Sequence, residues 1–392
     1  MDGGRHVPDA VRLEQAAHAM AAKFARRAAD HDRDGSFPFE NFDALHSAGL
    51  MNIVLPAARG GGDAGLITIA RVVGAIAAGD ASTALVLLMH YLQMASVLRS
   101  NRWPAHLREH VVQASIDGVA LINTLRVEPE LGTPARGGLP ATTARRVAEG
   151  WRITGRKIYS TGSPALRYGL VWARTADEEP TVAGPMVGMF LMPVPSPGLR
   201  IEMTWDHLGM RASGSHDVVL EDVLIPADHA VDIRPPAEWL VRDPIQGIWS
   251  TVGVSALYDG VARAARDWLV SYLHTRKPAN LGAALATLPR FQEAVGRIEA
   301  MLEANRILIE AVAAAADADP SAVPPTRASL VKMTVTDNSI AAVGLAMELV
   351  GNPGLSRTNP LERHHRDVLC SRVHTPQNDM IMLAAGRQAL GL

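Results

Sequence analysis

The chain has 392 residues, of which 48% are hydrophobic and 20% are charged. A domain uses on the order of 150 residues, so we expect two or three domains with plenty of apolar surface to bury. The formal net charge is −2 and the basic residues are dispersed, which argues against nucleic acid and an anionic membrane surface as partners.

Cysteine use and apolar runs bear on the cellular compartment. The single cysteine, Cys370, cannot form a disulfide within the chain. The sequence shows neither a signal peptide nor an uninterrupted apolar run of about 18 residues. We therefore expect a cytoplasmic protein, and we assign no metal ligands.

Helical spacing of apolar residues dominates the first 117 residues. One helix is expected over residues 8–30, ended by the polar run 31–36, and two more over residues 66–78 and 81–99. The last of these is so apolar from Leu85 to Met89 that we expect it to be buried. His90 follows that run, and on the helix alone such a histidine is more often a hydrogen-bonded core residue than a catalyst.

From Gly118 the composition changes, with more Val, Ile and Thr and frequent Gly and Pro up to about Pro226. Strands are expected over residues 119–127, 142–147, 151–159, 168–174, 186–192 and 217–225. Residues 142–159 should form a hairpin that turns at Glu149-Gly150 and is kinked at Thr154-Gly155. A β-domain is therefore inserted between helical parts.

The strand that ends in Ser160-Thr161-Gly162-Ser163 carries small hydroxyl residues around a glycine. We expect this end to expose backbone N–H groups and hydroxyl donors, which can hydrogen-bond the acceptor-rich edge of an isoalloxazine ring. An ordinary hairpin end is the alternative, because turns are rich in Gly and Ser anyway.

Pro235-Pro236 marks a linker, and long helices are expected over residues 245–275, 288–316 and 328–350. The two compositional breaks divide the chain into an N-terminal helical domain of residues 1–117, a middle β-domain of residues 118–233 and a C-terminal helical bundle of residues 234–392. The predicted fold class is α+β.

Several segments, in order, resemble the acyl-CoA dehydrogenase superfamily. In chain order they are the loop Val127-Glu128-Pro129 with Gly132-Thr133, the strand ending at Ser163, the segment Leu208-Gly-Met-Arg211, the segment Glu221 to Pro226, and Arg366-Asp367. The resemblance covers nearly the whole chain. It implies an N-terminal helical domain, a middle β-barrel or β-sandwich domain and a C-terminal helical bundle, with a flavin cofactor. Arg211 and the Arg366-Asp367 pair are expected to be structural.

The resemblance also assigns residues to the flavin. Those near the ring are Thr124, Val127, Gly132, Thr133, Tyr159, Thr161, Ser163, Thr375 and Gln377. Val127 stands where the family usually has a threonine, so one hydroxyl donor is missing. A surface loop without a cofactor remains the alternative for residues 128–138.

Three further residues are assigned to the far end of a flavin dinucleotide. Arg276 matches an arginine that reaches the cofactor's phosphates, although the phenylalanine that follows it in the family is absent here. Gly351 and Gly354 resemble a turn that meets the adenosine end of FAD on a neighbouring subunit. The alternatives are a solvated charge at a helix end for Arg276 and a helix C-cap for the glycines.

An acyl-CoA dehydrogenase needs a carboxylate that removes a proton from the substrate. Thr375 occupies the position where most members carry this glutamate, and Ser250 occupies the position used by the others. Neither can be that base. The nearest carboxylates in the sequence are Asp379, and Asp243 or Asp259.

The segment Arg372-Val-His-Thr-Pro-Gln-Asn-Asp379 instead resembles the flavin-dependent monooxygenase branch of the superfamily, which includes dibenzothiophene monooxygenase. In that branch a histidine also follows an Asp-x-Ser pattern like Asp80-Ala-Ser82. The resemblance therefore implies that His90, His374 and Thr161 surround the reactive edge of the flavin, with the histidines exchanging protons near neutral pH. For His374, a helix-initiating residue before Pro376 is the alternative.

We thus expect a flavin-dependent oxidoreductase, namely a monooxygenase or oxygenase that uses reduced flavin and O₂ on a small organic or thioester substrate. The flavin is FAD or FMN, and its reduced form comes from a separate flavin reductase, because no nicotinamide fingerprint follows a strand. A homodimer or homotetramer is expected. Two alternatives stay open: an acyl-CoA dehydrogenase with a displaced base, and a non-catalytic paralogue that binds or assembles.

Overall fold

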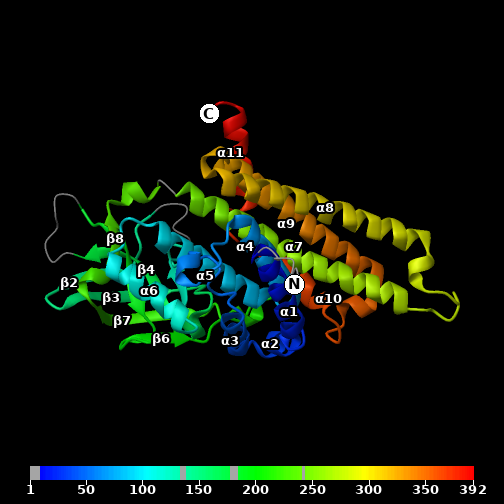
Figure 1. Ribbon diagram of the computed structural model, residues 1–392, viewed down its shortest axis with the longest axis horizontal. Coiled ribbons are helices and arrows are strands. Elements are labelled where there is room, and N and C mark those ends of the chain that lie inside the picture. Colours follow the sequence, from blue (N-terminus) through cyan, green and yellow to red (C-terminus); the bar gives the residue numbers. More distant parts are fainter. Residues whose placement is uncertain (1–8, 133–137, 177–183, 241–242) are drawn as a thin grey trace, which may run out of the picture.

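The structure is a computed structural model that describes residues 9–132, 138–176, 184–240 and 243–392. Helices, then a sheet, then helices follow one another along the chain, and the sheet lies at one end of the molecule (Figure 1). This confirms the predicted α+β fold. The helices stop at Asp117 and the strands lie between Leu121 and Arg234, while the division into three domains stays a prediction.

The first part is helical, with α1 (Asp9–Phe24), α2 (Ala28–Asp34), α3 (Phe39–Ser47), α4 (Leu66–Gly79), α5 (Ala81–Arg99) and α6 (Ala105–Asp117). The expectation of one helix over residues 8–30 is wrong, because the chain turns after Phe24 and a second helix continues into the polar run. Local bonds explain why that run is helical: Arg33 pairs with Asp30, and Gly35 adopts the left-handed conformation that ends the helix.

Helix α5 is the central helix of the core. Asp80 caps its N-terminus by accepting a hydrogen bond from the Ser82 amide. In the described part of the chain it is the one helix long and apolar enough to cross a membrane, but 83% of that window is buried inside the protein, as in the core helix of a soluble protein. The sequence expectation missed this window because His90 and Gln93 interrupt the apolar run.

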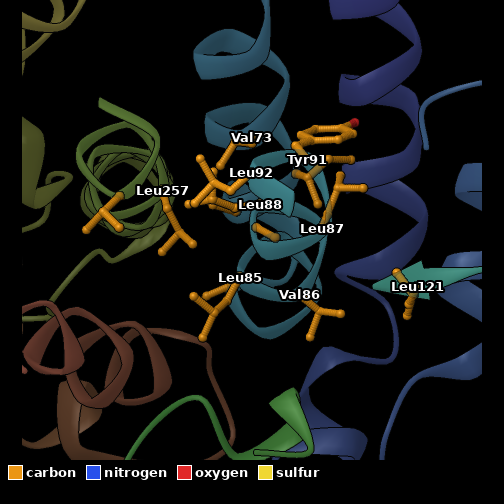
Figure 2. Packing of buried hydrophobic residues seen from close by; sticks show 14 of the residues in the cluster. Val73, Leu85, Val86, Leu87, Leu88, Tyr91, Leu92, Leu121 and Leu257 are labelled. Carbon is orange, nitrogen blue, oxygen red and sulfur yellow. The ribbon is translucent and has the colours of Figure 1, made fainter. Parts of the chain in front are cut away.

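Figure 2 shows how α5 is packed: Leu88 and Leu92 lie toward Leu257 on α7 (Pro244–Thr275), and Tyr91 points to the opposite side. The contact is close, since a Cβ on Gly253 of α7 would lie 2.4 Å from a methyl carbon of Leu88. Burial of a leucine side chain contributes about 1.5–3 kcal/mol. The predicted burial of this helix is confirmed.

The sheet has the order β6-β7-β3-β2-β4-β5-β8, with β1 paired to β4. Its strands are β1 (Leu121–Leu125), β2 (Thr143–Val147), β3 (Gly150–Lys157), β4 (Leu166–Ala176), β5 (Val187–Pro193), β6 (Leu199–Glu202), β7 (Asp217–Ile225) and β8 (Ala230–Arg234). The β2–β3 hairpin and its irregularity between Ile153 and Gly155 are as predicted. The short strands β6 and β8 were not expected.

The C-terminal bundle holds α7, α8 (Pro289–Ala318), α9 (Pro325–Val350), α10 (Leu361–Leu369) and α11 (Asn378–Ala389). Proline opens α7, α8 and α9, because its missing N–H is not needed in the first turn. The bundle is joined to the N-terminal helices where α7 crosses α4. Two glycines meet there, since a Cβ on Gly260 would lie 2.2 Å from the carbonyl oxygen of Gly74.

Candidate active site

A chain of hydroxyl groups lies where β3 gives way to the segment Ser160–Ser163. Thr161 Oγ1 is 2.9 Å from Ser215 Oγ, which is 2.8 Å from Ser213 Oγ. The Asn123 side chain donates to the Thr161 carbonyl oxygen at 3.0 Å, which connects this segment to β1. Ser213 and Ser215 were not predicted, and the signal that could have found them is that they directly follow the motif ending in Arg211.

The backbone N–H groups of this segment are already used. Those of Ser160, Gly162 and Ser163 donate to carbonyl oxygens of residues 213–216, and that of Thr161 donates to the carbonyl of Tyr159. The expectation that they are exposed is therefore wrong, because the loop after Arg211 covers them. The Ser163 hydroxyl is buried and donates to the Gly214 carbonyl. A ligand bound at this segment would therefore find side-chain hydroxyl groups as hydrogen-bonding partners, and not backbone N–H groups.

An aromatic cluster stands beside Thr161. Trp205 and His207 stack with ring centroids 3.6 Å apart, and Tyr159 approaches both edge-on. Tyr159 has a positive φ of 55° and is 54% exposed, so its ring is held at the surface of the protein. Trp205 and His207 were missed by the sequence analysis, and Tyr159 is where the flavin contact was predicted.

The loop after β1 is fixed by a buried ion pair. Lys157 donates to Glu128 at 2.6 Å, and both side chains are at most 2% exposed. Burial lowers the pKa of Lys157 to about 8, although Glu128 offsets part of that effect. For Glu128 burial raises the pKa, but hydrogen bonds from Lys157 and Thr142 outweigh it and the pKa is lowered. Glu128 therefore organises the loop.

Four predicted flavin-side residues lie at the end of β1 and in this loop. Val127 accepts a hydrogen bond from the Ile158 amide through its carbonyl, and Gly132 pairs with Glu128 in a positive-φ turn. The Thr124 amide donates to the Asn123 side chain. Thr133 lies outside the described residues. The loop thus runs alongside the end of β3, one residue before Tyr159.

His90 is enclosed by the N-terminal helices and β1. It is 1% exposed, and its Nδ1 accepts a long hydrogen bond of 3.4 Å from the Ile122 amide. The proton of the neutral ring therefore lies on Nε2, a buried atom with no hydrogen-bond partner in the described structure. Burial lowers its pKa to about 4, and the Met51 backbone opposes part of that effect.

His374 lies in the turn between α10 and α11. Its ring is 5.7 Å from that of Tyr258 on α7, measured between centroids. Burial, together with the charge of Lys332 on α9, lowers the pKa of His374 to about 4. The predicted ring contacts Thr375 and Gln377 are half-buried in the same turn.

These values correct one expectation about the two histidines. Both were expected to titrate near neutral pH, but burial keeps both rings neutral there. In the free protein they can donate or accept hydrogen bonds as neutral imidazoles. The structure ties His90 to the hydroxyl chain through the adjacent β1 residues Ile122 and Asn123, whereas His374 belongs to the bundle.

Arg276, Gly351 and Gly354 lie elsewhere in this chain. Arg276 is the exposed C-cap of α7, and Gly351 ends α9 with a positive φ. Figure 1 shows these ends of α7 and α9 at the opposite end of the molecule from the sheet. Within one chain they are therefore not brought together with Thr161.

The carboxylates nearest in sequence to Thr375 and Ser250, where the resemblance predicts the family's catalytic base, have structural partners. Asp259 binds Arg263 at 2.6 Å and Asn305 at 3.0 Å. Asp243 caps α7 by accepting from the Ile245 amide, and Asp379 is exposed in the first turn of α11. Asp259 therefore forms an ion pair and a hydrogen bond inside the bundle, and Asp243 serves as a helix cap.

Arg211 and the Arg366-Asp367 pair have the structural contacts expected of them. Arg211 binds the side chain of Asp206, and Arg366 binds that of Asp32. Asp367 accepts a hydrogen bond from the Met210 amide at 2.7 Å. These contacts fasten α10, and with it the His374 turn that follows, to the loop that carries Ser213 and Ser215.

Family models match three parts of the chain: the acyl-CoA dehydrogenase N-terminal domain over residues 9–101, the middle domain over residues 126–223 and the C-terminal domain over residues 252–378. YdbM of Bacillus subtilis (strain 168), to which acyl-CoA dehydrogenase activity is provisionally assigned, is 34% identical over 93% of this chain and 92% of its own.

L-evernosamine nitrososynthase of Micromonospora sp. (strain ATCC 39149 / NRRL 15099 / SCC 1413) is 30% identical over 94% of this chain and 88% of its own. The solved structure of KijD3 in complex with FMN and dTDP-3-amino-2,3,6-trideoxy-4-keto-3-methyl-D-glucose superposes with a TM-score of 0.84, at 30% identity, over 98% of this chain and 94% of that one. With its three matched domains, the chain belongs to the acyl-CoA dehydrogenase family.

Proposed function

We propose that this protein is a flavin-dependent monooxygenase that uses reduced flavin and O₂ to oxygenate a small organic or thioester substrate. One argument carries the proposal: the resemblance places Thr375 and Ser250 at both family positions of the catalytic base, and in the structure Asp259 and Asp243 are held by structural partners. A threonine or serine hydroxyl does not remove an α-proton without a base beside it.

The residues around Thr161 fit a flat cofactor with a polar edge. The hydroxyls of Thr161, Ser213 and Ser215 form a row of groups that donate and accept. Two buried polar atoms without a partner in the described residues lie near this row: Ser160 Oγ in the same segment, and His90 Nε2 on the helix that β1 connects to it. Such atoms are costly in a folded protein, and a bound group with hydrogen-bonding edges would satisfy them.

A bound reduced flavin would supply the electrons for the reduction of O₂. The protein's part is to hold the cofactor and to control protons and water. Thr161 would hydrogen-bond the ring, and Tyr159 would cover part of it. The neutral Nε2–H of His90 can donate a hydrogen bond, and neutral His374 can accept a proton from a substrate group. Apolar side chains such as those of α5 would keep bulk water away.

The relatives support oxygen chemistry. A nitrososynthase is among them at 30% identity, and KijD3, at the same identity, was solved with FMN and an amino-sugar nucleotide. FMN or FAD, supplied in reduced form by a separate reductase, is therefore the cofactor we propose.

A dehydrogenase remains the second candidate, because YdbM, at 34% identity, carries that provisional assignment. For this activity a carboxylate from another position would have to reach the substrate. Asp379 is the one of the three candidates that lies on the same segment as Thr375.

The test starts from the purified protein with FMN or FAD. A flavin reductase with NADH supplies reduced flavin, and oxygen uptake and product oxidation are followed with candidate amines, thioethers and acyl-CoA esters. We expect substrate-dependent oxygen uptake and no bleaching of oxidised flavin by any acyl-CoA. Bleaching by an acyl-CoA, lost in Asp379→Asn, would replace the proposal with the dehydrogenase. Failure to bind either flavin would favour the non-catalytic paralogue.

We also propose that the protein works as a homodimer or homotetramer. Arg276 and Gly351 lie at the far end of the bundle from Thr161, so they could reach a flavin only on a neighbouring chain. Sedimentation of the flavin-loaded protein should give an oligomer. A flavin-loaded monomer with unchanged affinity in Arg276→Ala would contradict this.

A further inference from the structure

A buried lysine on α9 has no role in the function proposed so far. Lys332 is one of four lysines in the chain, and it is 1% exposed. No carboxylate of the described residues lies within ion-pair distance of it. Its Nζ instead lies 3.3 Å from the carbonyl oxygen of Ser371 and 3.0 Å from those of His374 and Pro376.

We propose that Lys332 is a positioning residue for His374: its ammonium group gathers three carbonyl oxygens of the turn that carries His374 and thereby fixes where the imidazole lies. The inference rests on the proposed role of His374 in the reaction. An ammonium group has three N–H donors and no acceptor, so three converging carbonyls satisfy it completely.

Hydrogen bonds from α9 hold the backbone at His374 and also just after it. Lys332 binds the carbonyl of His374 itself and that of Pro376 two residues later. Asp337, further along α9, accepts hydrogen bonds from the Asn378 side chain at 3.1 and 3.3 Å. Helix α9 therefore holds the turn and the start of α11, while Tyr258 on α7 meets the ring.

The charge of Lys332 has a second consequence for the ring. A cation next to an imidazole disfavours its protonation, and Lys332 lowers the pKa of His374 in addition to the effect of burial. Burial also lowers the pKa of Lys332 to about 8, and Asp337 offsets part of that effect. The charged residues of the segment 371–379 itself are Arg372 and Asp379, and the end of α10 and the middle of α7 add Arg366, Asp367 and Asp259.

Three substitutions separate the hydrogen bonds from the charge. Lys332→Met removes both, Lys332→Gln keeps two N–H donors without charge, and Lys332→Arg keeps both in a larger group. Lys23→Met, at an exposed position of α1, is the matched control. Two readouts need neither flavin nor substrate: amide hydrogen exchange of residues 371–377, and the NMR titration of the His374 imidazole, assigned by its loss in His374→Asn.

We expect Lys332→Met to speed exchange of residues 371–377 by at least about tenfold, which corresponds to the loss of a hydrogen-bonded anchor. In Lys332→Gln the titration midpoint of His374 should rise by about one pH unit, and in Lys332→Arg it should stay near the wild-type value. The acid limb of the pH profile of turnover should shift with it. Lys23→Met should change none of these.

The inference is overturned if Lys332→Met and Lys332→Gln leave both the exchange and the titration of His374 unchanged. It is also overturned if both readouts change but turnover keeps its wild-type rate and pH profile. Should Lys332→Met fail to fold, the pair Lys332→Gln and Lys332→Arg still decides the question. A His374→Ala variant with wild-type turnover would instead refute the role of His374 in the proposed function, and this outcome can be told apart from the other two.

Discussion

Two buried lysines lie in the two parts of the molecule that carry the candidate site residues, and they are held in different ways. On the strand side, made up of Glu128, Lys157, Thr161 and Ser215, Lys157 meets a carboxylate and its charge is neutralised. On the bundle side, made up of Tyr258, Lys332 and His374, the Lys332 ammonium donates to carbonyl oxygens and forms no ion pair with a carboxylate of the described residues. The strand side is therefore a scaffold, whereas the bundle side applies an electrostatic field to a histidine.

The largest effect is expected at His374, which tests whether the bundle side performs the proton chemistry. General acid–base groups contribute about 10²–10⁴-fold to turnover, so His374→Ala should lower substrate-dependent oxygen uptake by roughly that factor. Its denaturation midpoint should change little because the residue is half-buried. His18→Ala, at an exposed position of α1, is the control. Wild-type turnover in His374→Ala would remove the proposed difference between the two sides.

Lys157→Met should have the largest effect on stability. It leaves the Glu128 carboxylate buried without its cation, and breaking a buried pair costs about 3–5 kcal/mol. Urea denaturation would measure the loss, with Lys23→Met expected to stay within about 0.5 kcal/mol of the wild type. A loss below about 1 kcal/mol would mean that the hydrogen bonds from Ala141 and Thr142 suffice for Glu128.

The two sides also differ in how far the sequence predicts them. The strands and the segment ending in Ser163 follow from local patterns, because alternation and turn residues are set by neighbours in the chain. The covering of the Ser160–Ser163 amides by residues 213–216 does not, since the two segments are about 50 residues apart in sequence and meet only when β3 pairs with β7. The strand was predictable from the sequence, but the pairing of the backbone N–H groups at its end was not.

On the bundle side the bounds of the long helices were predicted nearly to the residue. Which of their side chains are buried was not predicted. Lys332 sits in an ordinary helical pattern, and nothing near it in sequence marks it as buried. The pKa values of the histidines depend on burial, which a sequence does not state, so reasoning from the unperturbed value failed for both.

His90 gives a prediction for stability in acid. Its pKa is about 4 in the folded protein and 6.5 when exposed, so the unfolded chain binds a proton first as the pH falls. Stability is thus fully present above pH 6.5 and declines between pH 6.5 and 4, by about 3 kcal/mol from this residue. In His90→Gln the decline should be smaller, while in His18→Gln it should match the wild type. An equal decline in His90→Gln would contradict the buried neutral ring.

Gly260 tests how closely α7, the helix that carries Tyr258, packs against α4. A helical Gly→Ala change normally stabilises by up to about 1 kcal/mol. At Gly260 the new Cβ would lie 2.2 Å from the Gly74 carbonyl, so we expect a loss of about 1–3 kcal/mol instead. Gly344→Ala on α9 meets nothing within 4 Å and should stabilise the protein. If both variants gain stability by thermal denaturation, the close packing of α7 is refuted.

The smallest effect is expected at Thr161, on the strand side. Its hydroxyl already pairs with Ser215, so Thr161→Ala removes one hydrogen bond to the flavin and leaves the scaffold in place. A single neutral hydrogen bond contributes about 1 kcal/mol, which corresponds to a five- to tenfold weaker flavin affinity in a fluorescence titration. Thr161→Ser keeps the hydroxyl and should bind flavin like the wild type. A fall in turnover as large as that of His374→Ala, at unchanged flavin affinity, would show that Thr161 acts in the chemistry and that both sides of the site take part in it.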